Sequence, residues 1–106
     1  MPSKKGKNLG LNLEKLFEVL STSSGSCWAI NNYCPYKGIG PDSPADKNYN
    51  GGFATSLMNK DLSLAIEAAK STDTKVNYGI QSQHSYAKLV DDGHGNLDFS
   101  CIVEKL

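Results

Sequence analysis

The fold is decided by residues 51–70, which read GGFATSLMNKDLSLAIEAAK. Apolar side chains recur in this stretch every three or four positions, which predicts one amphipathic helix over about residues 53–70. Asp61 falls inside the apolar arc, between Leu57 and Ala65, where an ionised carboxylate is costly unless it is paired or hydrogen-bonded. We therefore expect Asp61 to join a polar network in a pocket, or to serve as a structural cap or ion pair. The polar arc of the helix is expected to comprise Ser56, Asn59, Ser63, Glu67 and Lys70.

Further helices are expected on both sides of this one. The first begins after Asn12, a good N-cap, and ends in the serine-rich stretch 21–26. Another covers about residues 76–91 and stops at the glycine-rich residues 93–96. Asp98 then caps a last short helix. No segment shows the alternation of a strand, so the sequence predicts an all-α bundle.

Residues 27–52 separate the first two helices and are expected to form a long ordered loop with little regular structure. Three of the four prolines lie there, and its aromatic content is too high for a disordered linker. Trp28 and Tyr33 are suited to lining a pocket, or else to packing the loop onto the helices. The glycine pair 51–52 allows close approach of an anion to a helix N-terminus, or is simply a turn. By spacing alone, Lys60 is an ordinary exposed lysine with a packed aliphatic stem.

Composition excludes several classes of protein. The chain has 106 residues, enough for one domain or part of one. Its net charge is zero and all eleven basic residues are lysines, which argues against nucleic acid as a partner. No apolar run approaches the roughly 20 residues of a membrane span, and no apolar segment follows the basic start, so neither membrane insertion nor secretion is expected. Three cysteines without a CxxC pair indicate free thiols and no zinc site.

Several motifs resemble a known family. Residues 23–28 (SSGSCW) resemble the SSG-x-x-W of 3-hydroxyisobutyrate dehydrogenases, and residues 33–35 (YCP) are similar to their Y-N-P. Residues 48–65 are similar to the family's Y-x-G-G-F…L-M-x-K-D-L-x-L-A, and residues 98–100 to its D-F-S. The chain thus resembles the carboxy-terminal helical domain of these β-hydroxyacid dehydrogenases, which are related to 6-phosphogluconate dehydrogenases.

The resemblance implies an activity and roles for particular residues. The family oxidises 3-hydroxyisobutyrate to methylmalonate semialdehyde with NAD in valine breakdown, at a site between a Rossmann domain and the helical domain. By this likeness Lys60 contacts the nicotinamide end of the cofactor or the substrate, and Phe53 lines the nicotinamide pocket. Trp28 and Tyr33 line the substrate side, and Asp61 holds the polar network.

The resemblance also implies what this chain does not supply. It has neither the Rossmann glycines nor the G-x-G-x-x-x-K-x-x-N-N segment of the family's catalytic lysine, so we expect no catalytic residue here and no turnover by this chain alone. Residues 1–8 are expected to be a disordered or expression-derived end, and residues 9–106 the NAD-binding, dimerising domain. Apolar surface should be exposed, which favours a homo-oligomer.

Two alternatives to this reading stay open. One is a relative with another small β-hydroxyacid substrate, such as tartronate semialdehyde. The other is a non-catalytic helical oligomerisation module. By the same resemblance, the expected compartment is the mitochondrial matrix in a eukaryote and the cytoplasm in a bacterium.

Overall fold

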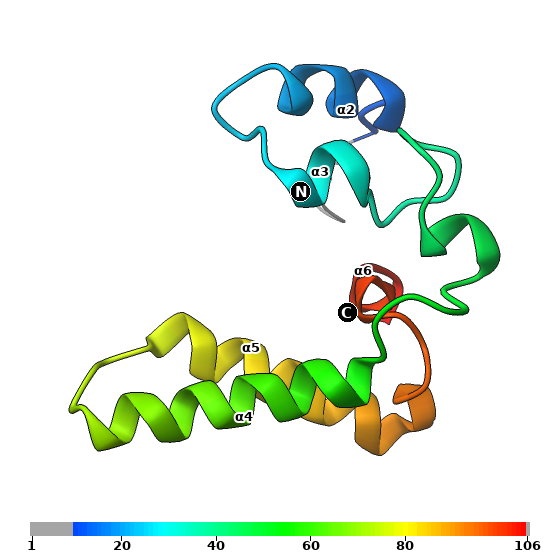
Figure 1. Cartoon of the computed structure of the whole chain (residues 1–106). Helices are drawn as coiled ribbons and strands as arrows, with labels where there is room; N and C mark the ends of the chain where they lie inside the picture. Colours follow the sequence, from blue (N-terminus) through cyan, green and yellow to red (C-terminus); the bar gives the residue numbers. More distant parts are fainter. Residues whose placement is uncertain (1–9, 106) are drawn as a thin grey trace.

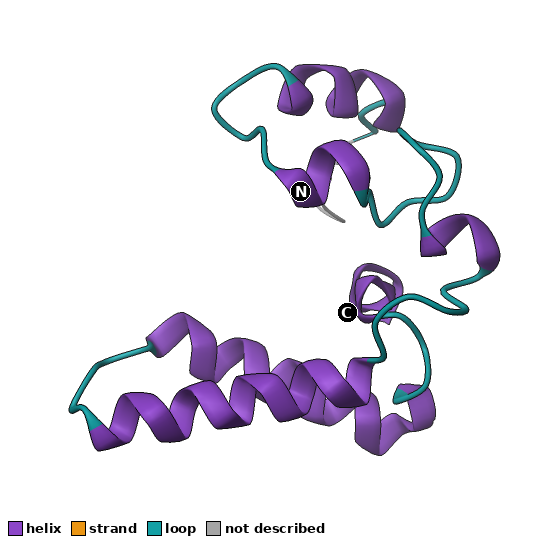
Figure 2. Cartoon of the chain, viewed as in Figure 1, coloured by secondary structure: helices purple, strands orange, loops and turns teal. Residues whose placement is uncertain are grey.

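The computed structural model describes residues 10–105, and the end expected at residues 1–8 lies outside them. Over this range no strand forms, and the one bridge of strand type joins Ala54 to Asp98 (Figure 2). The all-α prediction is confirmed. The α-helices are α2 (Leu13–Ser21), α3 (Trp28–Asn32), α4 (Thr55–Ser71), α5 (Asn77–Leu89) and α6 (Ile102–Lys105), and three further helical turns are η1 (Pro44–Lys47), η2 (Val90–His94) and η3 (Phe99–Cys101).

The helices are arranged in two groups with α6 between them. α4 and α5 lie side by side and run in opposite directions, while α2 and α3 lie on the other side of α6 (Figure 1). The radius of gyration is 14.8 Å. A compact domain of this length is expected to have a radius of about 13 Å. The molecule is therefore more open than a single-core bundle.

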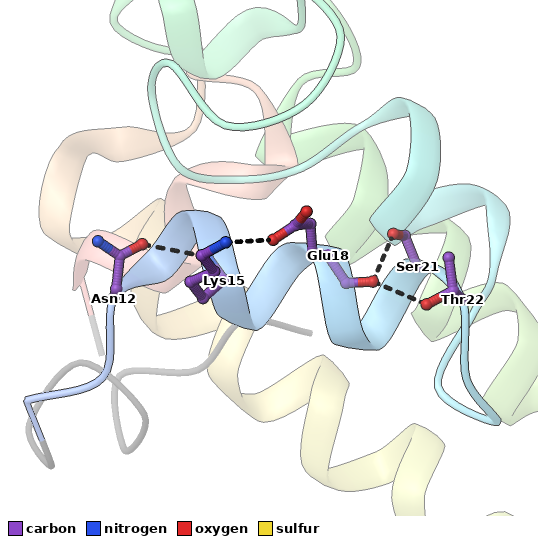
Figure 3. Close-up of polar contacts among 5 residues, drawn as sticks. All are labelled: Asn12, Lys15, Glu18, Ser21 and Thr22. Carbon is purple, nitrogen blue, oxygen red and sulfur yellow. Dashed lines mark hydrogen bonds and ion pairs between the residues drawn. The ribbon is translucent and has the colours of Figure 1, made fainter.

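The start of α2 follows directly from the sequence. The Oδ1 atom of Asn12 accepts a hydrogen bond from the backbone N–H of Lys15 at 3.1 Å (Figure 3), which confirms the predicted N-cap. At the other end, the hydroxyls of Ser21 and Thr22 both donate to the Glu18 carbonyl. Lys15 and Glu18 also form an ion pair at 3.2 Å, but both side chains are exposed, so it contributes little.

Two hydrophobic clusters meet at the segment formed by η3 and α6. Val103 packs with the cluster beneath α2, whereas Cys101 packs with the cluster between α4 and α5. Residues 101–103 therefore join the two groups of helices. The first cluster comprises Cys34, Tyr36, Ile39 and Val103, with Leu13 and Phe17 against it. The second comprises Tyr86, Leu89 and Cys101, with Tyr49, Met58, Leu62, Leu97, Phe99 and Ile102 against it.

The long loop at residues 27–52 is ordered, as expected, and its regular structure is limited to one short helix and one helical turn. It contains α3 and η1, and it buries Ile30 completely. The Ser43 hydroxyl donates to the Cys34 carbonyl at 2.9 Å, and the Tyr49 hydroxyl donates to the Pro35 carbonyl at 2.7 Å. These contacts satisfy backbone groups that a buried loop would otherwise leave unpaired.

The assignment of faces on α4 needs correction. Asn59, predicted on the solvent arc, accepts a hydrogen bond from the Gln83 side chain of α5 at 2.9 Å. Leu57 and Leu64, predicted in the core, are 47% and 53% exposed. Apolar residues lie on several sides of this helix, so the hydrophobic pattern does not determine which side meets α5. The expected exposure of apolar surface is confirmed.

Candidate functional site

Four aromatic rings from separate parts of the chain form one continuous stack. Trp28 stacks on Tyr33 with ring centroids 5.3 Å apart, and Tyr33 stacks on Phe99 at 5.5 Å. Phe53 then meets Phe99 edge to face at 6.2 Å. We call these four residues the aromatic stack. It brings together Trp28, Tyr33 and Phe53, which the sequence singled out, through Phe99, whose part in the stack the sequence did not reveal.

The outer end of the aromatic stack is open to solvent. The Trp28 side chain is 64% exposed, whereas Tyr33, Phe99 and Phe53 are partly buried. Trp28 is the first residue of α3, Tyr33 follows that helix, and Phe53 precedes α4. Their order along the stack places a large planar apolar surface at the edge of the molecule. Such a surface suits a planar or small apolar ligand.

A buried carboxylate, Asp98, lies behind the aromatic stack. Its side chain is 0% exposed. One oxygen, Oδ1, accepts from the Tyr33 hydroxyl at 2.6 Å and from the Phe53 N–H at 2.8 Å. The other, Oδ2, accepts from the N–H and the hydroxyl of Ser100. Four donors thus match the four acceptor positions of an ionised carboxylate. The predicted capping role is confirmed, and the bonds to Tyr33 and Phe53 are additional.

Gly52 is required by this arrangement. Its φ of +70° lies in the left-handed region that disfavours side chains. A Cβ at this position would collide with the carboxylate of Asp98 and lie 2.8 Å from the Tyr33 hydroxyl. The glycine therefore leaves room for the Tyr33–Asp98 hydrogen bond.

The N-terminus of α4 does not offer free amides to an anion. The N–H of Thr55 donates to the Leu97 carbonyl at 2.8 Å, and that of Ser56 donates to the Gly95 carbonyl at 3.0 Å. The N–H of Phe53 is bonded to Asp98. The possibility that this end of the helix binds an anion through these groups was therefore wrong, because the chain itself uses them.

Asp61 does not face the core. It is exposed, as is the neighbouring Lys60, and no ion pair between residues 10 and 105 includes either of them. A solvated carboxylate carries no burial cost, so the reason for expecting a pocket around Asp61 was wrong. The buried carboxylate of the site is Asp98. The sequence indicated it only as a helix cap.

The Tyr33 hydroxyl is a fixed neutral donor. Burial, and then its hydrogen bond to Asp98, raise the pKa of Tyr33 to about 12. Deprotonation is therefore unfavourable near neutral pH, and Tyr33 does not act as a base there.

Other site classes find little support in residues 10–105. That part of the chain has no cluster of three His, Cys, Asp or Glu side chains able to hold a metal ion. None of its helices is long and apolar enough to cross a bilayer. The three cysteines are free thiols, of which Cys27 is exposed and Cys34 and Cys101 are buried.

Taken together, the helices and the aromatic stack define an all-helical domain with an aromatic surface exposed at one edge. Residues 5–106 match the family described as NAD-binding of NADP-dependent 3-hydroxyisobutyrate dehydrogenase. The chain belongs to this family and corresponds to its carboxy-terminal, NAD-binding domain. The resemblance seen in the sequence is confirmed.

Several relatives are similar over nearly the whole chain. The probable 3-hydroxyisobutyrate dehydrogenase of Mycobacterium tuberculosis (strain H37Rv) is 41% identical over 100 residues, covering 94% of this chain and 34% of that protein. The mitochondrial enzyme of Bos taurus is 39% identical over 101 residues, covering 95% of this chain and 30% of that protein. The chain therefore spans about a third of the length of these relatives.

A solved structure shows the same fold. The M. tuberculosis 3-hydroxyisobutyrate dehydrogenase with L-serine superimposes with a TM-score of 0.89 at 40% sequence identity, covering 95% of this chain and 34% of that one. At this identity and score the likeness extends to the arrangement of all the helices described above.

Proposed function

We propose that this chain forms the carboxy-terminal side of the active site of an NAD-dependent 3-hydroxyisobutyrate dehydrogenase. The observation that carries the proposal is the aromatic stack. Trp28 is exposed at one end of it, and the partly buried Phe53 lies at the other end. Phe53 packs beside the nicotinamide, while Trp28 and Tyr33 face the small apolar part of the substrate. NAD, when bound, accepts the hydride released by the alcohol.

Charged groups on α4 complete this side of the site. Lys60 is exposed and carries a free ammonium group, which suits the substrate carboxylate or the carboxamide of the nicotinamide. Asp61 follows it, is also exposed, and takes part in the polar network around the ligand. Their availability to solvent supports both roles, because neither side chain is engaged in an ion pair within residues 10–105.

Proton transfer requires a group that this chain does not supply. Burial and the hydrogen bond to Asp98 raise the pKa of Tyr33 and keep it neutral, and the sequence lacks the family's catalytic lysine segment. We therefore expect the chain alone to form no NADH when it is incubated with NAD and racemic 3-hydroxyisobutyrate. NADH absorbance above the blank would contradict this expectation.

A chimera tests the proposed function. This chain replaces the matching third of the M. tuberculosis enzyme, to which it is 41% identical. We expect the chimera to reduce NAD with 3-hydroxyisobutyrate. Lys60→Ala should lower kcat/KM about tenfold to a hundredfold, the range for a lost hydrogen bond to a charged group. Lys70→Ala, in the last turn of the same helix, is the matched control and should change little.

The same chimera separates the alternatives. Equal or greater kcat/KM with tartronate semialdehyde and NADH, or with NADP in place of NAD, would reassign the substrate or the cofactor. A folded chimera that reduces no cofactor with any β-hydroxyacid would refute the proposed function and favour an oligomerisation module. Because the Bos taurus relative named above is described as mitochondrial, we expect the mitochondrial matrix for a eukaryotic source and the cytoplasm for a bacterial one.

A further inference from the structure

We propose that Asp98 is the positioning residue of this site, fixing the Tyr33 ring and through it the exposed face of Trp28. Its importance for a ligand rests on the proposed function, but its effect on Trp28 does not. The inference begins from the partners of one carboxylate. Oδ1 receives donors from residues 65 and 45 positions earlier in the chain, Tyr33 and Phe53.

The two oxygens of Asp98 have separate partners. Oδ2 performs the capping of η3, because both of its donors come from Ser100, two residues later. A cap needs no more than this, as Asn12 shows at the start of α2 with its single bond from Lys15. Oδ1 is therefore not needed for the cap. Its two donors are the Tyr33 hydroxyl and the backbone N–H of Phe53, both from residues of the aromatic stack.

This attachment determines the orientation of the stack. The Tyr33 ring is fixed at its hydroxyl by Asp98 and on its face by Phe99. Trp28 stacks on that ring while 64% of its own surface stays exposed. Since little else covers Trp28, its orientation depends on the ring beneath it. A charge-assisted hydrogen bond in a buried place is well suited to hold such a ring.

Backbone contacts support the same point. The Asp98 N–H donates to the Tyr49 carbonyl at 2.8 Å, and the N–H of Phe99 donates to the Phe53 carbonyl at 2.8 Å. Asp98 and its neighbour are thereby held against the segment that leads into α4. These bonds hold the backbone of Asp98 in place beside Tyr33.

The test uses Trp28, the one tryptophan of the chain, as a reporter. Tyr33→Phe keeps the ring and removes the bond to Oδ1. We expect the fluorescence anisotropy of Trp28 to fall and its near-ultraviolet circular dichroism band to weaken, with the far-ultraviolet spectrum unchanged. Ser100→Ala, which removes one donor from Oδ2, should leave both Trp28 signals as they are. Asn12→Ala, a cap substitution on α2, should lower Tm without changing Trp28.

The outcomes separate cleanly. Anisotropy and tryptophan dichroism in Tyr33→Phe equal to those of the unaltered chain overturn the proposal. If Asp98→Ala folds, it must lower the anisotropy and the dichroism of Trp28 at least as much as Tyr33→Phe does. A folded Asp98→Ala variant in which both Trp28 signals are unchanged also overturns the proposal. If that variant does not fold, Tyr33→Phe decides alone. Loosened Trp28 together with an inactive chimera refutes the proposed function and leaves the positioning role standing.

Discussion

Gly52 and Gly51 provide a matched pair for measuring what the site requires of the backbone. Both have left-handed φ angles, +70° and +77°. A Cβ at position 51 meets nothing within 4 Å, whereas one at position 52 collides with Asp98 and crowds the Tyr33 hydroxyl. Gly51→Ala therefore measures the backbone cost alone, and Gly52→Ala measures that cost plus the loss of the hydrogen bond.

The magnitudes follow from these contacts. A non-glycine residue in the left-handed region costs roughly 1–2 kcal/mol, which is the full expectation for Gly51→Ala. Displacing the Tyr33 hydroxyl from a buried carboxylate adds roughly 1.5–3 kcal/mol, so Gly52→Ala should lose about 2.5–5 kcal/mol in total. Such a loss is large against the roughly 5–15 kcal/mol by which a small domain is stable, because even the lower end of the sum, about 2.5 kcal/mol, is half of the smallest value.

Urea denaturation followed by far-ultraviolet circular dichroism measures both variants, with equal m-values required for the comparison. We expect Gly52→Ala also to loosen Trp28, and Gly51→Ala not to do so. Equal losses of stability in the two variants, with identical Trp28 signals, would falsify the conclusion that Gly52 makes room for the Tyr33–Asp98 bond.

Three further predictions concern other parts of the chain. Hydrogen bonds from the backbone N–H groups of Gly38 and Ser43 lower the pKa of Asp46, so its contribution to stability is present above the ordinary value of 3.8 and is lost as the pH falls through the lowered folded pKa. Asp46→Asn should reduce the loss of unfolding free energy at acid pH, measured by urea denaturation at several pH values. An unchanged pH dependence of the unfolding free energy would contradict the assignment. Asn12→Ala should cost about 1 kcal/mol of unfolding free energy, and no loss would show that the cap is dispensable. The exposed Leu57 and Leu64 should drive concentration-dependent association of the chain, and the double variant Leu57→Lys with Leu64→Lys should abolish it. A strict monomer in sedimentation of the unaltered chain would refute this prediction.

Features decided by nearby residues could be predicted from the sequence. The caps at Asn12 and Asp98 are local, since each side chain bonds a backbone N–H within three residues. The second role of Asp98 depends on Tyr33 and Phe53, far away in the sequence, and no periodicity shows it. The family resemblance pointed to Trp28 and Phe53, but it did not indicate what holds them together.

The misplacement of Asp61 has a simple physical origin. A helical wheel identifies an apolar arc only when apolar residues lie on one side, and α4 carries them on several. Its contact with α5 includes a polar pair, Asn59 with Gln83, which leaves Leu57 and Leu64 outside. The side of α4 that bears Asp61 is therefore decided by its partners and not by its own pattern.

The segment that joins the two hydrophobic clusters also affects how the chain is made. Asp98, Cys101 and Val103 follow nearly all of their partners in sequence, so a ribosome releases α2, α4 and the intervening loop before the residues that unite them. Until then the nascent helices lack a shared interior and present apolar side chains to chaperones. The shared core of the two groups of helices therefore forms only after residues 98–103 have left the ribosome, and a chain that stops shortly before Asp98 lacks the residues that join the two clusters.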